Sequence, residues 1–271
     1  KLRALSRPEF SLIDPRVYPY PEPVVDVRMS RGCPWNRCTF CAITMHQEGY
    51  RALPVPEVEP DLLAAHRTLR STFFRFRDDL LTPKQLQSLS QVMRRLPFSA
   101  RFSVRSRFEP DLTREVLAEA QQAGLEEIWL GLESASPRVR SLMQKGVEQD
   151  VVERILDDAG ALGLRVRALC LLGFPGETPA ELRHTIDFLD QHQMQLASAA
   201  LTPFLLMRRS PLGQDPQSAG VQILPDKRPR HERLNAVLSA TWPGAPSKDQ
   251  LAALLDEASA RLGERFLDMS Y

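Results

Sequence analysis

The stretch Val24-Val25-Asp26-Val27-Arg28-Met29-Ser30-Arg31-Gly32-Cys33-Pro34-Trp35-Asn36-Arg37-Cys38-Thr39-Phe40-Cys41 joins a run of valines to a loop that carries three cysteines. The run from Val24 to Met29 predicts a β-strand, because β-branched residues are enriched in strands. The loop then leaves the carboxyl end of that strand, which is where parallel barrels place their chemistry. We therefore interpret this stretch as the first strand of a barrel-like fold and the start of its reactive mouth.

Five further strand-like runs follow, each short and bounded by polar or turn residues. Segments with helical periodicity separate them. Repetition of strand, helix and strand predicts parallel strands with right-handed crossovers and helices outside. Six such units favour an α/β fold built as a partial (β/α)6 TIM-like barrel over a closed eight-stranded one. The five runs are Thr72–Phe76, Ala100–Val104, Glu127–Leu130, Arg165–Leu172 and Ser198–Leu205.

The chain divides into three parts by composition. Residues 1–23, rich in proline and tyrosine towards their end, predict an extended lead-in or linker, and residues 24–207 contain the barrel pattern. Residues 208–271 are a C-terminal extension, in which residues 208–230 predict a loop with little regular structure. A helix is then expected from Ser247.

Several residues mark where the predicted helices begin and end. Thr178 with Glu181, and Ser247 with Gln250, are spaced as capping boxes at helix starts. Gly124 and Gly163 follow helical runs and are predicted to end them, because glycine adopts the left-handed conformation common there. These signals place the helix boundaries without reference to any other part of the chain.

Composition excludes several classes of protein. The 271 residues are 43% hydrophobic and 25% charged, which is typical of globular domains. Thirty-five basic and 34 acidic residues give a net charge of +1, so no general positive field attracts nucleic acid or anionic lipid. No apolar run approaches the roughly 18 residues of a membrane span. We therefore expect a cytoplasmic protein with neither a membrane nor a nucleic-acid partner.

The four cysteines indicate a metal site rather than a disulfide framework. Cys33, Cys38 and Cys41 share one short loop, which is typical of metal binding in a reducing cytosol. Three thiolates can hold three irons of a [4Fe–4S] cluster and leave the fourth iron open to a small molecule. A structural zinc site would need a fourth ligand, for which His46 is the nearby candidate. Cys170 lies in an apolar strand and is interpreted as a small core residue.

With these features the sequence resembles the radical S-adenosylmethionine (SAM) enzymes. Within them it is most similar to the branch that often carries an N-terminal cobalamin-binding domain. The resemblance extends from about residue 23 to residue 210, with five motifs in order. They are the cysteine loop, Arg75–Asp79, Leu130–Ser134, Met143–Gly146 and Gly173–Thr178. One feature departs from the family, since four residues rather than three separate Cys33 from Cys38. We expect a slightly larger loop around Trp35 and Asn36.

The resemblance implies a set of cofactor contacts. Cys33, Cys38 and Cys41 would hold the [4Fe–4S] cluster, whose open iron chelates SAM. Phe40 would lie beside the adenine, Glu133 at the ribose, Lys145 at the carboxylate, and Asp78 and Asp79 at the methionyl amino end. The other residues expected to contact SAM are Arg105 and Arg107 after the third strand, Ser134, and Gly173, Phe174 and Pro175.

The implied reaction is reductive cleavage of SAM to a 5′-deoxyadenosyl radical, which abstracts hydrogen from a substrate. Methyl transfer, cobalamin-dependent or not, and oxidative rearrangement of a small-molecule or natural-product substrate are the expected outcomes. A flavodoxin or ferredoxin would supply the electron. A coproporphyrinogen-oxidase-like activity and an RNA-modifying activity are the enzymatic alternatives, and a non-catalytic metal-binding protein is the alternative of a different class. Because the chain opens with Lys1 and a proline-rich lead-in, we expect an N-terminal cobalamin-binding domain before it.

Overall fold

The structure is a computed structural model that describes residues 7–17, 22–45, 49–225 and 236–263. One sheet of six strands forms its centre, in the order β1-β4-β5-β6-β7-β8 with every neighbouring pair parallel. The strands are β1 Val24–Val27, β4 Phe73–Phe76, β5 Arg101–Ser106, β6 Leu125–Glu133, β7 Arg165–Leu172 and β8 Leu196–Pro203. The predicted α/β partial barrel is confirmed.

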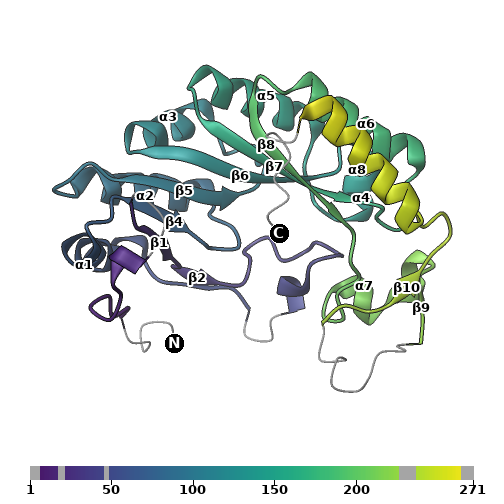
Figure 1. The fold of residues 1–271 in the computed structure, drawn as a ribbon, viewed down its shortest axis with the longest axis horizontal. Coiled ribbons are helices and arrows are strands. Elements are labelled where there is room, and N and C mark those ends of the chain that lie inside the picture. Colours follow the sequence, from purple (N-terminus) through teal and green to yellow (C-terminus); the bar gives the residue numbers. More distant parts are fainter. Residues whose placement is uncertain (1–6, 18–21, 46–48, 226–235, 264–271) are drawn as a thin grey trace.

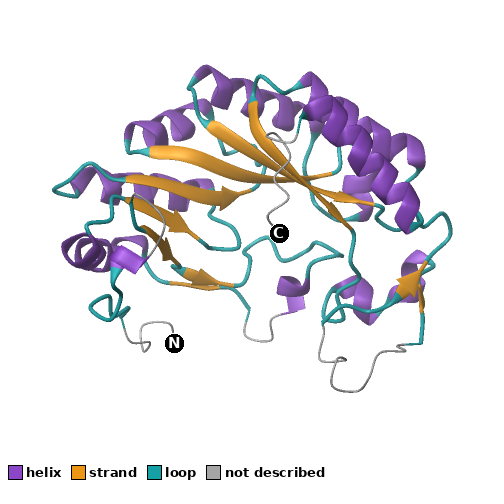
Figure 2. Cartoon of the chain, viewed as in Figure 1, coloured by secondary structure: helices purple, strands orange, loops and turns teal. Residues whose placement is uncertain are grey.

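The sheet is curved, and the main helices cover its convex side (Figures 1 and 2). Side chains that alternate along the strands face these helices, as Phe74 and Phe102 do, and both are fully buried. They join apolar residues of the helices in one large hydrophobic core. The helices of this layer are α1 Glu59–Leu69, α2 Pro83–Arg95, α3 Arg114–Gln122, α5 Gln149–Ala161, α6 Pro179–Gln191 and α8 Lys248–Leu262, and α4 Pro137–Leu142 follows β6.

Local signals set most helix boundaries as expected. The capping boxes of Thr178 with Glu181 and of Ser247 with Gln250 both form, at the starts of α6 and α8. Gly124 and Gly163 follow α3 and α5 with φ of 100° and 69°. At Gly124 an added Cβ would collide with the carbonyl oxygen of Ala100, so this position accepts glycine alone. The box of Thr82 with Gln85 at the start of α2 was not predicted.

Two predictions about regular structure need correction. The first strand ends at Val27 rather than Met29, and the next residues pair elsewhere, as β2 Ser30–Arg31 with β3 Arg51–Ala52. Part of the segment 208–230 is regular, with α7 Pro211–Gln214, a 3₁₀ turn at Pro216–Ala219, and β9 Gln222–Ile223 paired with β10 Ala240–Thr241. Prolines at the first positions of both helical turns stabilise these short elements, which periodicity cannot detect. Residues 226–230 lie outside the described residues.

Short 3₁₀ turns complete the described elements. They span Pro15–Val17, Ala42–Met45 and Val55–Val58. Cys170 lies in β7 at 2% exposure and belongs to the large core, as predicted. No helix within the described residues is long and apolar enough to cross a membrane.

Candidate active site

The cysteine loop is closed at its base by the small hairpin of β2 and β3. Ser30 pairs with Ala52 and Arg31 with Arg51, and the amide of Leu53 donates to the carbonyl of Met29 at 2.8 Å. Gly32 has a φ of 80°, and a Cβ there would lie 3.1 Å from the carbonyl oxygen of Gly49. The two ends of the loop therefore lie close together, and the cysteines follow a base that backbone hydrogen bonds hold.

Asp78 fastens this base to the sheet. It follows β4 and is fully buried. Its Oδ1 accepts hydrogen bonds from the amide of Met29 at 3.1 Å and from the hydroxyl of Ser30 at 2.5 Å. Burial raises the pKa of Asp78, and these two hydrogen bonds oppose the rise. The carboxyl group thus ends β1 and redirects the chain into β2, which explains why the strand stops two residues early.

None of the three thiols of the loop is part of a disulfide, and Cys38 is the buried one. Burial raises the pKa of the Cys38 thiol to about 11, while the positive charge of Lys145 opposes that rise. Among the described residues no three His, Cys, Asp or Glu side chains surround a single metal ion. A [4Fe–4S] cluster does not need such convergence, because each thiolate binds a different iron. His46, the candidate zinc ligand, lies outside the described residues.

Glu133 and Lys145 form a buried ion pair next to the cysteine loop. The Nζ of Lys145 donates to Oε1 of Glu133 at 2.6 Å, and each residue is 8% exposed. Burial by itself lowers the pKa of Lys145, but the charges of Glu133 and Cys38 outweigh it, so the shift is upward and the amine stays protonated. Glu133 ends β6 with a φ of 63°. A residue other than glycine adopts this backbone conformation only when its surroundings impose it.

The next turn of the mouth is built around Glu177. Its Oε2 accepts from the amides of Gly173 at 2.8 Å and Phe174 at 3.2 Å, and Ser134 donates its hydroxyl to Oε1 at 3.2 Å. Burial raises the pKa of Glu177 to about 7, against these hydrogen bonds. Ser134 is itself fully buried and within hydrogen-bond distance of Thr185 at 3.3 Å.

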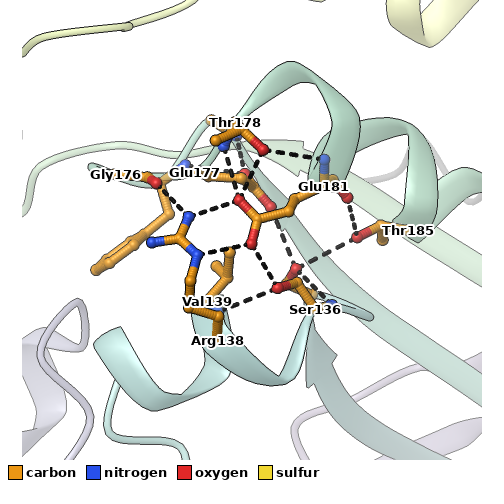
Figure 3. A network of polar contacts seen from close by, with 11 residues as sticks. Ser136, Arg138, Val139, Gly176, Glu177, Thr178, Glu181 and Thr185 are labelled. Carbon is orange, nitrogen blue, oxygen red and sulfur yellow. Dashed lines mark hydrogen bonds and ion pairs between the residues drawn. The ribbon is translucent and has the colours of Figure 1, made fainter.

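Figure 3 shows a second network, centred on Glu181, that ties α4 to the start of α6. Arg138 donates to Glu181 through Nε at 2.9 Å and Nη2 at 2.5 Å, and Nη2 also reaches the carbonyl of Gly176 at 2.6 Å. Ser136 adds a hydroxyl hydrogen bond at 2.7 Å. The Arg138 guanidinium lowers the pKa of Glu181 well below its usual value, although burial opposes it. The turn that carries Gly173 to Glu177 is therefore fixed from two sides.

A small hydrophobic cluster lines the cysteine loop. Val139, Met143, Phe174 and Leu212 belong to it, and the half-buried Phe40 packs against it. The carbonyl of Thr39 accepts from the amide of Leu212 at 2.9 Å. The segment after β8 is thus packed against the loop, and it covers the side on which Phe40 lies.

The structure brings most of the expected cofactor contacts to one end of the sheet. Glu133, Lys145, Gly173, Phe174 and Pro175 lie on loops or strand ends that follow β6 or β7, and Phe40 lies in the cysteine loop. Arg107 follows β5, and its guanidinium carbon lies 3.7 Å from the ring centroid of Trp35. Their contacts with SAM remain predictions.

Arg105 is placed differently from the prediction, whereas the SAM contacts expected of Asp78 and Ser134 remain predictions. Arg105 lies within β5 rather than after it, and its guanidinium stacks on Trp129 at 5.1 Å. Asp78 and Ser134 are fully buried and engaged with the protein, whereas Asp79 is half-buried. In this structure Asp78 and Ser134 hydrogen-bond to the loops that surround the mouth.

The sequence did not predict the side-chain contacts that hold the loops of the mouth together. Trp35 and Arg138 were not proposed as site residues, although both make several contacts there. The tryptophan within the four-residue spacer was the one available signal, because a large aromatic residue in a ligand loop needs a partner surface. Nothing in the sequence pattern pairs Arg138 with Glu181, since 43 residues separate them.

A partial parallel barrel with a three-cysteine loop at its mouth defines a class of iron–sulfur enzymes, and comparison identifies the family. The chain belongs to the radical SAM superfamily, whose sequence profile matches residues 27–189. Enzymes of this superfamily use a [4Fe–4S] cluster and SAM. The protein is therefore an enzyme, and the alternative of a non-catalytic metal-binding protein is wrong.

Two curated proteins are similar to this chain in sequence. The uncharacterized methyltransferase PH0819 of Pyrococcus horikoshii is 27% identical over 181 residues, covering 66% of this chain and 39% of the relative. The ribosomal protein uS12 methylthiotransferase RimO of Xanthomonas euvesicatoria is 27% identical over 260 residues, covering 84% of this chain and 50% of the relative. This chain thus spans half or less of the length of these curated relatives.

A solved structure shares the fold. It is the radical SAM methyltransferase TsrM from Kitasatospora setae, determined with cobalamin and a [4Fe–4S] cluster. The TM-score is 0.68 at 17% identity, covering 86% of this chain and 52% of that one. The likeness extends to the arrangement of strands and helices.

Proposed function

We propose that this chain is the SAM-cleaving barrel of a methyl-transferring radical SAM enzyme. The observation that carries the proposal is the cysteine loop, held at the carboxyl ends of the strands beside the buried pair of Glu133 and Lys145. The names of PH0819 and TsrM favour methyl transfer as the outcome. Three thiols outside any disulfide fit a [4Fe–4S] cluster, and the positive charge of Lys145 opposes the burial that raises the pKa of Cys38.

Each group of residues has a part in this function. Cys33, Cys38 and Cys41 would hold the cluster, which supplies the electron that cleaves a C–S bond of SAM to give a 5′-deoxyadenosyl radical. Lys145 would attract the carboxylate of SAM, and Glu133 would accept hydrogen bonds from the ribose. The hydrogen bond between Lys145 and Glu133 fixes both side chains, so the polar surface is formed before the ligand binds.

The turn at Gly173–Glu177 would shape the adenosine pocket with Phe40. Phe174 and Phe40 contact one hydrophobic cluster, which offers a flat apolar surface suited to an adenine ring. Glu177 fixes this turn through two backbone amides and does not need to contact the ligand itself. The rigid turn would keep water from the reactive carbon.

Cobalamin is part of the proposal through a domain that is not in this chain. TsrM binds cobalamin by its description, and its barrel resembles this one. The substrate would be a small molecule or natural product, and a flavodoxin or ferredoxin would supply electrons. RimO indicates the competing substrate class, since its name assigns it a ribosomal protein.

Anaerobic reconstitution tests the proposal. The protein should bind about four irons, absorb broadly in the visible range and release 5′-deoxyadenosine from SAM when reduced. Cys33→Ala, Cys38→Ala and Cys41→Ala should each abolish SAM cleavage, whereas Cys170→Ala, in the core, should retain it. A cluster with four irons that survives loss of Cys38 would overturn the ligand assignment.

SAM binding tests the pair of Glu133 and Lys145 separately. Glu133→Ala should weaken SAM binding by about 10- to 150-fold, because a charge-assisted hydrogen bond is worth roughly 1.5–3 kcal/mol. The iron content should stay at that of the parent protein. Unchanged affinity in an anaerobic titration would limit Glu133 to supporting the end of β6.

A further inference from the structure

The additional residue between Cys33 and Cys38 has a structural consequence. Asn36 lies in the left-handed region with a φ of 48°, and Trp35 precedes it. The indole Nε1 of Trp35 donates to the carbonyl of Gln144 at 3.0 Å. The ring also lies against Gly146, where a Cβ would come within 2.6 Å of its Cη2 atom. Trp35 therefore occupies the place that a side chain at residue 146 would take.

Arg107, which follows β5, contacts both Trp35 and the segment that Trp35 contacts. Its guanidinium carbon is 3.7 Å from the ring centroid of Trp35, which is a close cation–π contact. Its Nη2 donates to the carbonyls of Lys145 at 2.5 Å and Gly146 at 2.7 Å. Arg107 is 5% exposed, so water competes little for these hydrogen bonds.

Thr39 adds two more ties between the loop and this segment. Its amide donates to the carbonyl of Met143 at 3.0 Å, and its hydroxyl donates to that of Leu142 at 3.2 Å. Five successive carbonyls, from Leu142 to Gly146, thus accept hydrogen bonds from Thr39, Trp35 and Arg107. Positive φ values at Gln144 and Gly146 accompany this alignment of carbonyls.

We infer that Trp35 and Arg107 are positioning residues that set the distance between the cluster loop and Lys145. The segment that they hold carries Lys145, whose ammonium meets Glu133, and the loop that they hold carries two of the cluster ligands on either side of Trp35. The inference rests on the proposed function. The fourth spacer residue gives the loop the length at which the indole reaches residues 144–146.

Arg107 also places a charge beside the ligands. It interacts electrostatically with Cys38 and Cys33. Because a [4Fe–4S] cluster gains negative charge on reduction, a nearby cation favours the reduced form. Position and charge are therefore two separable contributions of the same side chain.

Variants of Arg107 separate these contributions. Arg107→Gln should retain about four irons but lower the midpoint potential of the cluster and weaken SAM binding about tenfold. Arg107→Lys keeps the charge and loses the paired hydrogen bonds, so the potential should stay close to that of the parent while SAM binding still weakens. The readouts are iron content, a redox titration followed by electron paramagnetic resonance, and the KM for SAM against kcat.

Arg37→Ala is the matched control. The Arg37 guanidinium also stacks on Trp35, at 4.9 Å, but residue 37 is exposed and its stacking ties the ring to no other segment. Its loss should leave the potential and the KM for SAM at parent values. An effect as large as that of Arg107→Gln would show that ring stacking alone is responsible and would overturn the inference.

Variants of Trp35 test the contact between the cysteine loop and residues 144–146 without a change of charge. Trp35→Phe keeps an aromatic ring but loses the Nε1 donor, and should raise the KM for SAM about threefold with an unchanged potential. Trp35→Ala should raise it tenfold or more. In the cluster-free protein, both should speed hydrogen exchange at the amide of Thr39, which donates to Met143, and circular dichroism checks that the fold is kept.

Two outcomes separate this inference from the proposed function. If the parent holds four irons and cleaves SAM while the Trp35 and Arg107 variants match it in potential, KM and hydrogen exchange, the positioning role is refuted and the function stands. If the parent itself neither holds iron nor cleaves SAM, the proposed function fails, and the inference fails with it.

Discussion

The ammonium of Lys145 lies 2.6 Å from the carboxylate of Glu133, and both side chains are about 10% exposed. The two residues come from different elements, since Glu133 ends β6 and Lys145 follows α4. Such a pair is stable as a unit, because each charge compensates the desolvation of the other. It also places one positive and one negative group at the mouth with no net charge, beside the buried thiol of Cys38.

Removing one charge of this pair should lower the free energy of unfolding more than replacing both charged residues. Lys145→Met leaves the carboxylate of Glu133 buried without a partner, and should lower the free energy of unfolding by about 3–5 kcal/mol. Adding Glu133→Gln should restore most of that loss. Urea unfolding of the cluster-free single and double variants measures the coupling, and additive losses would contradict the prediction.

Glu177 should make stability depend on pH. Its folded pKa of about 7 exceeds the unfolded value of 4.5, so the folded state holds its proton more tightly. The stability of the parent therefore falls as pH rises from about 4.5 to about 7, by about 3 kcal/mol in total. Glu177→Gln cannot ionise and should show a flatter profile in that window. Urea unfolding of both proteins at pH 5 and pH 8 measures the difference, and parallel profiles would refute it.

The contribution of Glu181 to stability should depend on pH in the opposite sense. Its folded pKa is depressed, chiefly by Arg138, so its stabilisation is present above pH 4.5 and is lost as pH falls below that value. Glu181→Gln should cost about 1 kcal/mol at pH 7, a modest value because Arg138 is half-exposed. Thermal unfolding at pH 7 and pH 3 is the measurement. The gap between parent and variant should narrow at pH 3, and a constant gap would contradict the assignment.

Asp78 should control the stability of the cysteine loop. Asp78→Ala leaves the amide of Met29 and the hydroxyl of Ser30 without their acceptor, and should cost about 2–4 kcal/mol, since each unsatisfied buried group costs about 1–3 kcal/mol. Iron should then be lost faster to a chelator. Asp78→Asn retains an acceptor oxygen and serves as the conservative control. Equal rates of iron loss in the parent and in Asp78→Ala would remove Asp78 from this role.

Local patterns in the sequence predicted the units of this fold well. Each predicted strand overlaps an observed one, and Arg165–Leu172 matches β7 at both ends. The capping boxes at Thr178 and Ser247 formed because their hydrogen bonds join residues three positions apart, so neighbouring sequence contains both partners. The short elements after Ser210 were missed because helical turns of four residues and strands of two are too short to show a period.

In the candidate site, too, local sequence predicted some features and long-range contacts decided the others. The sequence by itself determined that Cys33, Cys38 and Cys41 share a loop after a strand, because their spacing and the preceding valines are local. Only the tertiary structure decided what that loop contacts. Trp35 meets Gln144 from 109 residues away, Asp78 binds Met29 from 49 residues away, and a buried Lys145 finds its counter-charge in Glu133. These contacts depend on the order and curvature of the strands, which bring distant carbonyls and charges within a hydrogen bond's reach. Water is largely excluded from the contacts of Asp78 and of Lys145.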